Sequence, residues 1–268
     1  MSVPTMNVTS NSIIPVFEKQ LLVRAAQDWR PFSYSDWEQL EIEISYSQTL
    51  ICIEGSEHTL VVIKEEPRHT GFELVGLRDQ LQTLDSYHTS LAGKALQYAF
   101  WRDNHRFCGN CGSPTVSHAT EIALECPNCE AIYYPRLNPC VMVLITRGDH
   151  CLLAHNAAFR EGMYSAIAGY IEPGEAIEQT LHREVIEEVN LKVKNIQYFG
   201  SQPWPFPSQL MIAYTAEYGS GEIQVDGVEI TDAQWFHYSE LPKTPSIESI
   251  SGKLIRAFVE KFETHSQH

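Results

Sequence analysis

The sequence is short of basic residues and lacks any long apolar run. Its 268 residues include 19 Lys and Arg against 34 Asp and Glu, which gives a net charge of −15 at pH 7. A chain this acidic has no broad basic surface to attract nucleic acid, so any contact with RNA should be local and salt-sensitive. No apolar stretch approaches the roughly 20 residues of a membrane span, and residues 1–17 lack the basic start and apolar run of a secretory signal. We therefore expect a cytoplasmic protein.

Cysteines are few, but four of them are regularly spaced. Cys108 and Cys111 form one Cys-x2-Cys pair and Cys126 and Cys129 form a second, with fourteen residues between the pairs. Four thiolates at this spacing suit one tetrahedral Zn²⁺ in a closed structural site. The alternatives are a thioredoxin-like redox pair or disulfides. The other cysteines are predicted to be small buried residues in a reducing compartment: Cys52, Cys140 and Cys151.

A group of glutamates dominates the second half of the chain. Glu184, Glu187 and Glu188 fall within about one and a half turns of one predicted helix. Apolar residues every four positions mark its buried face, which places Glu184 and Glu188 at the edge of that face and Glu187 further out. Poorly solvated carboxylates need a counter-charge, so the pattern predicts a site for a divalent cation. The alternative is a solvated, Glu-rich helix face. The apolar residues are Ile177, Leu181, Val185 and Val189.

The same segment resembles the signature of the Nudix family. That signature reads Gly-x5-Glu-x7-Arg-Glu-U-x-Glu-Glu-x-Gly-U, where U is aliphatic, and the chain follows it from Gly169 to Leu191. It departs once, because Asn190 stands where the family has glycine. This residue follows the helix, and Asn tolerates the left-handed conformation that ends a helix. The resemblance implies a Nudix α/β/α sandwich and metal-dependent hydrolysis of a nucleoside diphosphate linked to another group, by attack of water on phosphorus.

A proline-rich segment, Ser201-Gln-Pro-Trp-Pro-Phe-Pro207, follows the glutamate helix. Its prolines are expected to hold an extended backbone from which two aromatic rings project as a rigid platform. Alone, such a string is more often a stiff connector or a polyproline ligand. With the cysteine pairs and the Nudix signature, it makes residues 105–255 similar to the NAD(H) pyrophosphatases of the Nudix family. This resemblance implies hydrolysis of NAD(H) to nicotinamide mononucleotide and AMP, removal of NAD caps from RNA 5′ ends, catalytic Mg²⁺ or Mn²⁺, structural Zn²⁺ and a homodimer.

The resemblance also implies roles for single residues. Glu184, Glu188, Glu229 and the backbone carbonyl of Ala168 are implied as ligands of the catalytic metal, and Glu187 as a further ligand or as the group that orients water. Stacking on the flat rings of the substrate is best suited to Tyr170, although a single aromatic residue is more often part of a core. Substrate contacts are implied for a larger set, with Arg24 as a further match: Arg78, Glu121, Tyr134, Tyr170, Gln202, Pro203, Trp204, Pro205, Phe206, Pro207, Ser208, Gln209 and Ser251.

These signals divide the chain into three parts of α/β class, with no internal repeat or low-complexity segment. Residues 1–104 are predicted to form an N-terminal α/β domain, 105–134 the four-Cys zinc ribbon, and 135–268 the Nudix catalytic domain. Hydrophobic patterning within these parts predicts strands and helices. The predicted strands are 50–53, 60–63, 141–145, 151–154 and 210–215, and the predicted flanking helices are 90–103 and 247–262.

A different class of function stays open from the sequence. Nudix folds also serve as regulators that bind nucleotides without cleaving them, and a zinc ribbon can be a nucleic-acid module. The intact Glu184, Glu187 and Glu188 favour catalysis, and the acidic charge argues against a DNA-binding role.

Overall fold

A computed structural model describes residues 11–51, 55–67 and 70–264. The chain divides into two compact units. One runs to Arg136 and includes Pro205–Ser208, and the other comprises Leu137–Trp204 and the residues from Gln209 onward. The zinc-ribbon residues fall in the first unit, and the three-part division at residues 104 and 134 stays a prediction. Within the described ranges, no helix is both long and apolar enough to cross a membrane.

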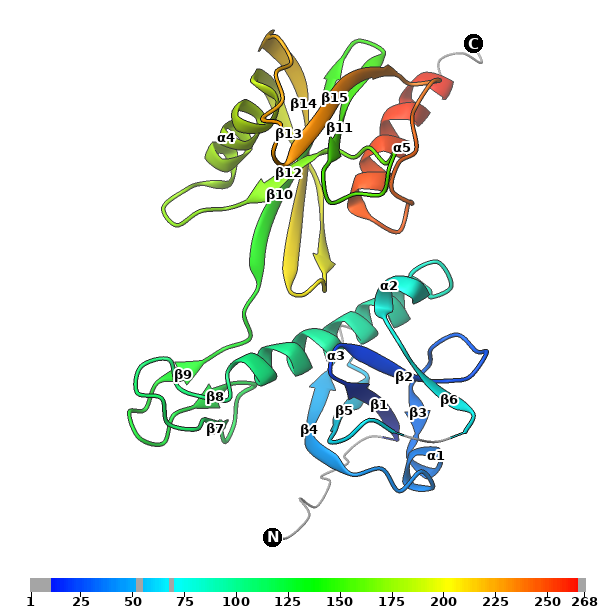
Figure 1. Ribbon diagram of the computed structural model, residues 1–268, viewed down its shortest axis with the longest axis vertical. Helices are drawn as coiled ribbons and strands as arrows, with labels where there is room; N and C mark the ends of the chain where they lie inside the picture. The colour runs from blue at the N-terminus through cyan, green and yellow to red at the C-terminus, as the bar shows by residue number, and fades with distance from the viewer. Residues whose placement is uncertain (1–10, 52–54, 68–69, 265–268) are drawn as a thin grey trace. The chain divides into compact units, whose positions relative to one another are not determined.

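The first unit is built on a six-stranded sheet in the order β4-β5-β1-β2-β6, with β3 paired to β1 (Figure 1). One face of the sheet packs against Leu91 and Ala95 of α3, and the other face packs against Trp37 of α1. Apolar side chains therefore fill both sides of the sheet. The elements are β1 (Ser12–Phe17), β2 (Gln20–Arg24), β3 (Phe32–Ser33), α1 (Tyr34–Glu38), β4 (Ile44–Ile51), β5 (Glu57–Ile63), β6 (Phe72–Val75), α2 (Leu77–Gln80) and α3 (Ser86–Asn104).

The predicted elements of this unit are found with shifted ends. The strand at 60–63 is confirmed within β5, and 50–51 belong to β4. The rest of the 50–53 prediction, and the predicted burial of Cys52, lie outside the described residues. The predicted helix is confirmed as α3 but begins at Ser86, because the Asp85 carboxylate accepts a hydrogen bond of 2.9 Å from the backbone N–H of His88 and caps the helix there.

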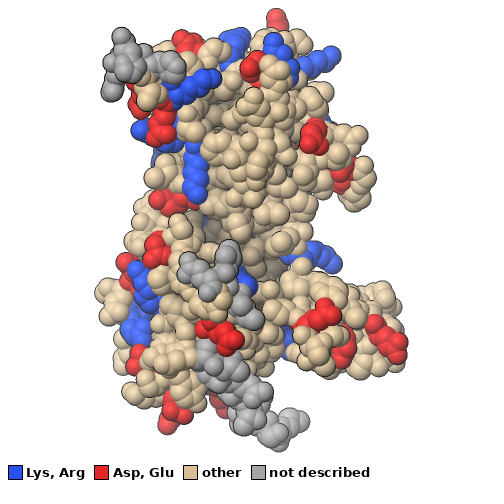
Figure 2. Space-filling model, turned by 180° about the vertical axis from the view of Figure 1, so that it is seen from behind, with Lys and Arg blue, Asp and Glu red and all other residues tan. Residues whose placement is uncertain are grey.

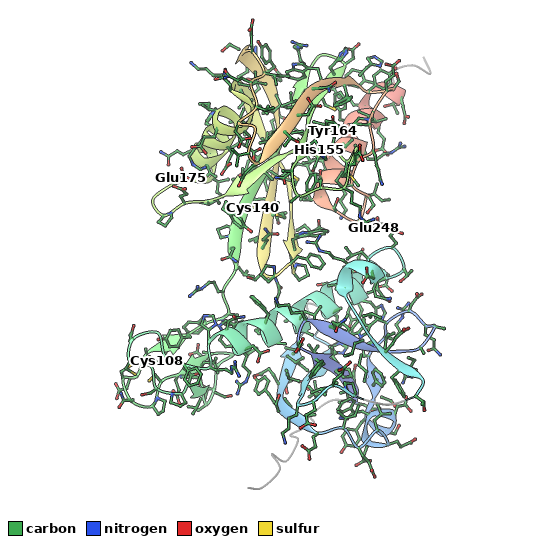
Figure 3. All side chains as sticks on the ribbon, viewed as in Figure 1. Cys108, Cys140, His155, Tyr164, Glu175 and Glu248 are labelled. Carbon is green, nitrogen blue, oxygen red and sulfur yellow. The ribbon has the colours of Figure 1, made fainter. Side chains whose placement is uncertain are left out.

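The ribbon consists of three two-residue strands and the four cysteines. The strands are β7 (Val116–Ser117), β8 (Leu124–Glu125) and β9 (Ile132–Tyr133). The four sulfur atoms lie within 4.8 Å of one another, and none is in a disulfide; Figure 3 labels Cys108 among them. The Tyr133 hydroxyl lies 3.1 Å from Cys108 Sγ and accepts a 2.9 Å hydrogen bond from Gly109 N–H. Four sulfur donors without an open position fit one structural Zn²⁺.

The second unit is a mixed six-stranded sheet between two helices, in the order β13-β14-β10-β11-β15 with β12 paired to β10 (Figure 1). Helix α4 covers one face through Leu181 and Val185, and α5 covers the other through Leu254 and Phe258. The predicted α/β/α sandwich is confirmed. The elements are β10 (Asn138–Arg147), β11 (His150–Asn156), β12 (Ile167–Tyr170), α4 (Ile177–Val189), β13 (Leu191–Trp204), β14 (Gln209–Gly221), β15 (Ile230–His237) and α5 (Ile250–Glu263).

Most predicted elements of the sandwich are also confirmed. The strands at 141–145, 151–154 and 210–215 lie within β10, β11 and β14, and Asn190 ends α4 with φ 56° in the left-handed region. The final helix begins at Ile250 rather than 247, because Ser249 Oγ accepts a 3.1 Å hydrogen bond from Gly252 N–H and caps it. Cys140 and Cys151 are buried, as predicted.

We predict that Cys126→Ser lowers the melting temperature or disrupts assembly while leaving the chemical step of the remaining folded protein intact. The closed four-cysteine site contributes its metal-binding energy to folding of the ribbon. Zinc content, melting temperature and oligomeric state should be measured together. Cys151→Ala, which removes a buried thiol outside the ribbon, should keep the full zinc content. A zinc-free preparation that melts and assembles like the wild type would show that the site is not structural.

Candidate active site

The loop between β12 and α4 is held by one ion pair. Arg183 Nε lies 2.7 Å from Glu175 Oε1, and its Nη2 lies 2.9 Å from Oε2, so the two side chains meet as a fork (Glu175 is labelled in Figure 3). Thr180 Oγ1 and the backbone N–H of Glu172 also donate to Glu175, over 2.7 and 3.1 Å. These donors, Arg183 first, lower the pKa of Glu175 to about 2. Glu175 is therefore ionised at neutral pH and fully engaged in shaping the loop.

The same guanidinium reaches the rest of the motif. Arg183 Nη1 lies 2.7 Å from Glu184 Oε1 and 3.0 Å from Glu187 Oε2. Its Nη2 also donates over 2.9 Å to the carbonyl oxygen of Tyr170, the last residue of β12. One cation thus joins the loop, the strand and the helix.

Gly169 is required by the position of Glu184. A Cβ atom added at residue 169 would lie 1.9 Å from the carboxyl carbon of Glu184 and 2.0 Å from its Oε1. Any side chain here would therefore displace the carboxylate toward Arg183 or out of the site. The requirement is one of space, and it explains why this position of the motif carries no side chain.

Of the three motif glutamates on α4, Glu188 is the one for which no hydrogen bond to Arg183 is found among the described residues. It is 4% exposed, and its Oε2 has no hydrogen-bond partner among the described residues. Burial, followed by the charges of Glu184 and Glu229, raises the pKa of Glu188 to about 8. Burial also raises the pKa of Glu184, although Arg183 opposes this. The predicted phase of α4 is confirmed, because Glu184 and Glu188 are buried whereas the side chain of Glu187 is 58% exposed.

Glu229 sits on a turn organised by Asp226. The Asp226 carboxylate accepts hydrogen bonds from the backbone N–H groups of Val228, Glu229 and Ile230, over 3.0, 3.2 and 2.8 Å. The carbonyl of Glu229 accepts from Ala157 N–H at 2.9 Å. The side chain of Glu229 is exposed and close enough to raise the pKa of both Glu184 and Glu188. The backbone of this acid is fixed before any cation binds.

The donor set fits a hard divalent cation. Carboxylate oxygens and a backbone carbonyl at Ala168, next to Gly169 on β12, are the ligands that Mg²⁺ and Mn²⁺ prefer. The unpartnered, buried oxygen of Glu188 is the observation that calls for a counter-ion. The cysteine cluster is the only set of three or more ligand side chains within 4.8 Å of one another in the described residues, so the glutamates are more widely spaced.

Several predicted substrate residues have structural partners. Both ends of the Gln202 amide form hydrogen bonds near the start of α5. Its Nε2 donates a 2.7 Å bond to the carbonyl oxygen of Glu248, and its Oε1 accepts a 2.7 Å bond from the N–H of Ile250. Ser251 is buried, with its Oγ 2.7 Å from Ser165 Oγ. Tyr170 is half-exposed and accepts a hydrogen bond from Gln209 Nε2. Arg24, in the first unit, pairs with Asp36 at 2.8 Å.

The two aromatic rings of the proline-rich segment each pack against an apolar core of their own unit. Trp204 packs against the core beneath α5 in the second unit. Phe206 packs against the core of the first unit, with the Arg78 guanidinium 4.3 Å from its ring centre. The predicted stacking platform stays a prediction. Pro203 remains in β13, whereas Pro205–Ser208 belong to the first unit, with Ser208 buried.

Arg78 and Phe206 line a pocket of 460 Å³ within the first unit. Its wall is mainly apolar and carries two basic side chains and one acidic side chain, a composition typical of small-molecule sites. The remaining lining residues are Lys19, Gly76, Leu77, Asp79, Leu96, Phe100, Pro205 and Pro207.

Glu121 and Tyr134 come together in the ribbon segment. A hydrogen bond between them is the main reason that the pKa of Tyr134 is raised, and the Tyr134 ring is 56% exposed. The structure thus gathers Glu121 with Tyr134, Arg78 with Phe206, and Tyr170 with Gln209.

Sequence reasoning missed three contacts that shape the site. They are the Arg183 bond to the Tyr170 carbonyl, the bond between Gln209 and Tyr170, and the Asp226 turn. Only the last had a local signal, because an Asp that precedes Gly often caps its own turn. Cys140, on β10 (Figure 3), is a further neighbour: burial, then Glu184 and Glu188, raise the pKa of its thiol to about 12.

Surface charge agrees with the acidic composition. On the face drawn in Figure 2, Lys and Arg side chains are interspersed with Asp and Glu rather than gathered into one patch. A long-range basic track for nucleic acid is absent from that face of the described residues.

Comparison with known proteins places these features in a family. Residues 136–258 match the NUDIX domain, and residues 103–134 match the NADH pyrophosphatase zinc ribbon domain. The chain is 43% identical over 227 residues to "NAD-capped RNA hydrolase NudC" of Stutzerimonas stutzeri (strain A1501), covering 84% of this chain and 82% of that protein. It is 44% identical over 206 residues to the protein of the same name from Pseudomonas syringae pv. syringae (strain B728a), covering 77% and 74%.

A solved structure supports the fold. The Nudix hydrolase from Nitrosomonas europaea superposes with a TM-score of 0.51 at 21% identity, over 59% of this chain and 93% of that one. The chain is 43% identical to the Stutzerimonas stutzeri relative over most of both sequences, and its buried glutamates lie on the helix that the motif predicts. The chain therefore belongs to the Nudix hydrolase family.

Proposed function

We propose that this protein hydrolyses the pyrophosphate of NAD(H) to nicotinamide mononucleotide and AMP, and that it removes NAD caps from RNA 5′ ends. The NudC relatives support this substrate class by name, and the NADH pyrophosphatase zinc ribbon supports it by domain content. The single observation that carries a hydrolytic role is the buried, unpartnered carboxylate of Glu188 beside the Arg183 fork.

The residues that would hold Mg²⁺ or Mn²⁺ are Glu184, Glu188, Glu229 and the carbonyl of Ala168. When bound, the metal supplies charge neutralisation at the non-bridging phosphate oxygens and activates water. Arg183 holds Glu184 in place from the loop side, and Gly169 leaves room for its carboxylate. Glu187, which is exposed and paired with Arg183, would orient water or add a ligand.

The assembly is implied by the resemblance, and the compartment is predicted from the sequence composition. We infer a homodimer, as in similar enzymes of the family, and a cytoplasmic location. None of the six described cysteines is in a disulfide, and four of them form the zinc cluster. Sedimentation of the purified protein tests the assembly.

Incubation with NADH and Mg²⁺, followed by chromatography, tests the activity directly. We expect reduced nicotinamide mononucleotide and AMP in equal amounts, and release of nicotinamide mononucleotide from NAD-capped RNA. Comparing kcat/KM for NADH, NAD⁺ and capped RNA in one buffer ranks the substrates. Tight binding of NADH without cleavage would instead support a regulator.

We predict that Glu188→Gln lowers kcat by more than about 100-fold, because replacing residues that merely support a metal ligand already costs 10–100-fold. The amide keeps the shape of the side chain, so melting temperature should not fall. Glu178→Gln, an exposed change in the first turn of the same helix, is the matched control and should keep activity. Hydrolysis by Glu188→Gln within a few-fold of the wild type would remove this residue from the site.

The raised pKa of Glu188 predicts a pH-dependent stability difference. With the pKa near 8 in the folded protein and about 4.3 in an unfolded chain, the folded state binds more protons between these values, so its stability falls as pH rises through this window. Gln cannot ionise. In buffer without added Mg²⁺ or Mn²⁺, urea unfolding from pH 5 to 8 should therefore show the wild type losing stability relative to Glu188→Gln. The slope should be no steeper than about 1.4 kcal/mol per pH unit. A constant difference across this range contradicts the burial of an ionising Glu188.

Tyr170→Ala should weaken handling of the nicotinamide half of the substrate. The lost stacking contact should cost about 1–3 kcal/mol in kcat/KM for NADH. The loss should be smaller for ADP-ribose, which has no nicotinamide ring. Steady-state kinetics with both substrates measure the difference, and equal losses would mean that the ring supports the catalytic loop rather than the base.

A further inference from the structure

The ring of Tyr170 is held at one point only. It is 51% exposed, and its phenol oxygen accepts a hydrogen bond from Gln209 Nε2. Within the described ranges, no aromatic or cationic side chain packs against this ring, and Gln209 is its only side-chain partner. The faces of the ring are therefore accessible, while its tip is fixed.

The backbone of Tyr170 is anchored more firmly than its side chain. Tyr170 pairs with Cys140 where β12 lies beside β10. The carbonyl of Tyr170 accepts a 2.9 Å hydrogen bond from Arg183 Nη2. Neither contact restrains rotation about the side-chain bonds of Tyr170. The direction in which the ring points then depends on the bond at its tip.

The sheet register allows Gln209 to provide that bond. β10 lies between β14 and β12, with Asn138 opposite Gln209 and Cys140 opposite Tyr170. Asn138 and Cys140 are two residues apart and so lie on the same face of β10. Gln209 and Tyr170 consequently project from the same face of the sheet, about 10 Å apart across the strands and about 7 Å apart along them. Two long side chains can bridge this separation.

Gln209 is itself rigidly placed. It is the first residue of β14 and pairs with both Asn138 and Trp204. Trp204 packs into the core beneath α5, which fixes the strand end next to Gln209. The strand that follows the proline-rich segment therefore begins with a side chain of defined reach.

We propose that Gln209 is a positioning residue, which orients the Tyr170 ring for stacking on the nicotinamide of the substrate. This inference rests on the proposed function, and it gives the first residue of β14 a part in base recognition. Tyr170 contacts the substrate, and Gln209 acts through Tyr170. A ring ordered before the substrate arrives loses less rotational freedom on binding.

The test uses the full-length protein and three variants: Gln209→Met, Tyr170→Phe and the double variant. Met keeps the length of Gln without its amide, and Phe keeps the ring without its hydroxyl. A single net hydrogen bond corresponds to about a 3–10-fold effect. Each single variant should raise KM for NADH by about that factor with little change in kcat. Each should lower the ratio of kcat/KM for NADH to that for ADP-ribose by a similar factor.

The double variant separates positioning from general weakening. Because both single changes break the same bond, the double variant should be no worse than either one. Gln197→Met, the same change at an exposed site on β13, is the control and should match the wild type. Multiplicative effects, a normal KM in Gln209→Met, or equal losses for NADH and ADP-ribose would each overturn the inference. A wild-type protein that fails to cleave NADH would instead overturn the proposed function.

Discussion

The catalytic half of the chain depends on the guanidinium of Arg183. Its five hydrogen bonds reach Glu175 twice, Glu184, Glu187 and the carbonyl of Tyr170. A single positive charge among so many carboxylates cannot neutralise them all. The carboxylate that lacks positive charge is that of Glu188, which is buried and has an oxygen without a hydrogen-bond partner among the described residues. The arrangement that shapes the loop therefore also creates the demand for a divalent cation, and the two properties cannot be altered separately at Arg183.

Features fixed by local spacing could be predicted from the sequence. The phase of α4, the left-handed Asn190 and the four-cysteine cluster depend on residues close in the chain, where helix periodicity and ligand spacing apply. Features fixed by distant parts of the chain could not. The contact between Gly169 and Glu184 requires β12 to lie against α4, and the two bonds of Gln202 require α5 to begin beside β13. Motif positions marked these residues without indicating what they touch.

The proline-rich segment illustrates the same limit. Its side chains are divided among separate contacts, each within its own unit: Gln202 binds the start of α5, Trp204 packs against the core beneath that helix, and Phe206 packs against the core of the first unit. Prolines favour this division, because a stiff backbone presents successive side chains in different directions without further ordering. A stiff segment loses less conformational entropy when its side chains pack than a flexible loop of the same length would lose.

Burial of acidic groups sets a balance between stability and function in this sandwich. Glu184 and Glu188 occupy helix positions next to the apolar stripe of Leu181 and Val185, where apolar residues would stabilise the fold more. The large cores on both faces of the sheet offset this cost. Because Arg183 binds Glu184 with one nitrogen and the Tyr170 carbonyl with another, a shift of the Glu184 carboxylate changes the restraint on the strand end that carries the Tyr170 ring. Glu184, the proposed metal ligand, and the backbone of Tyr170, the proposed stacking residue, are therefore both held by the side chain of Arg183.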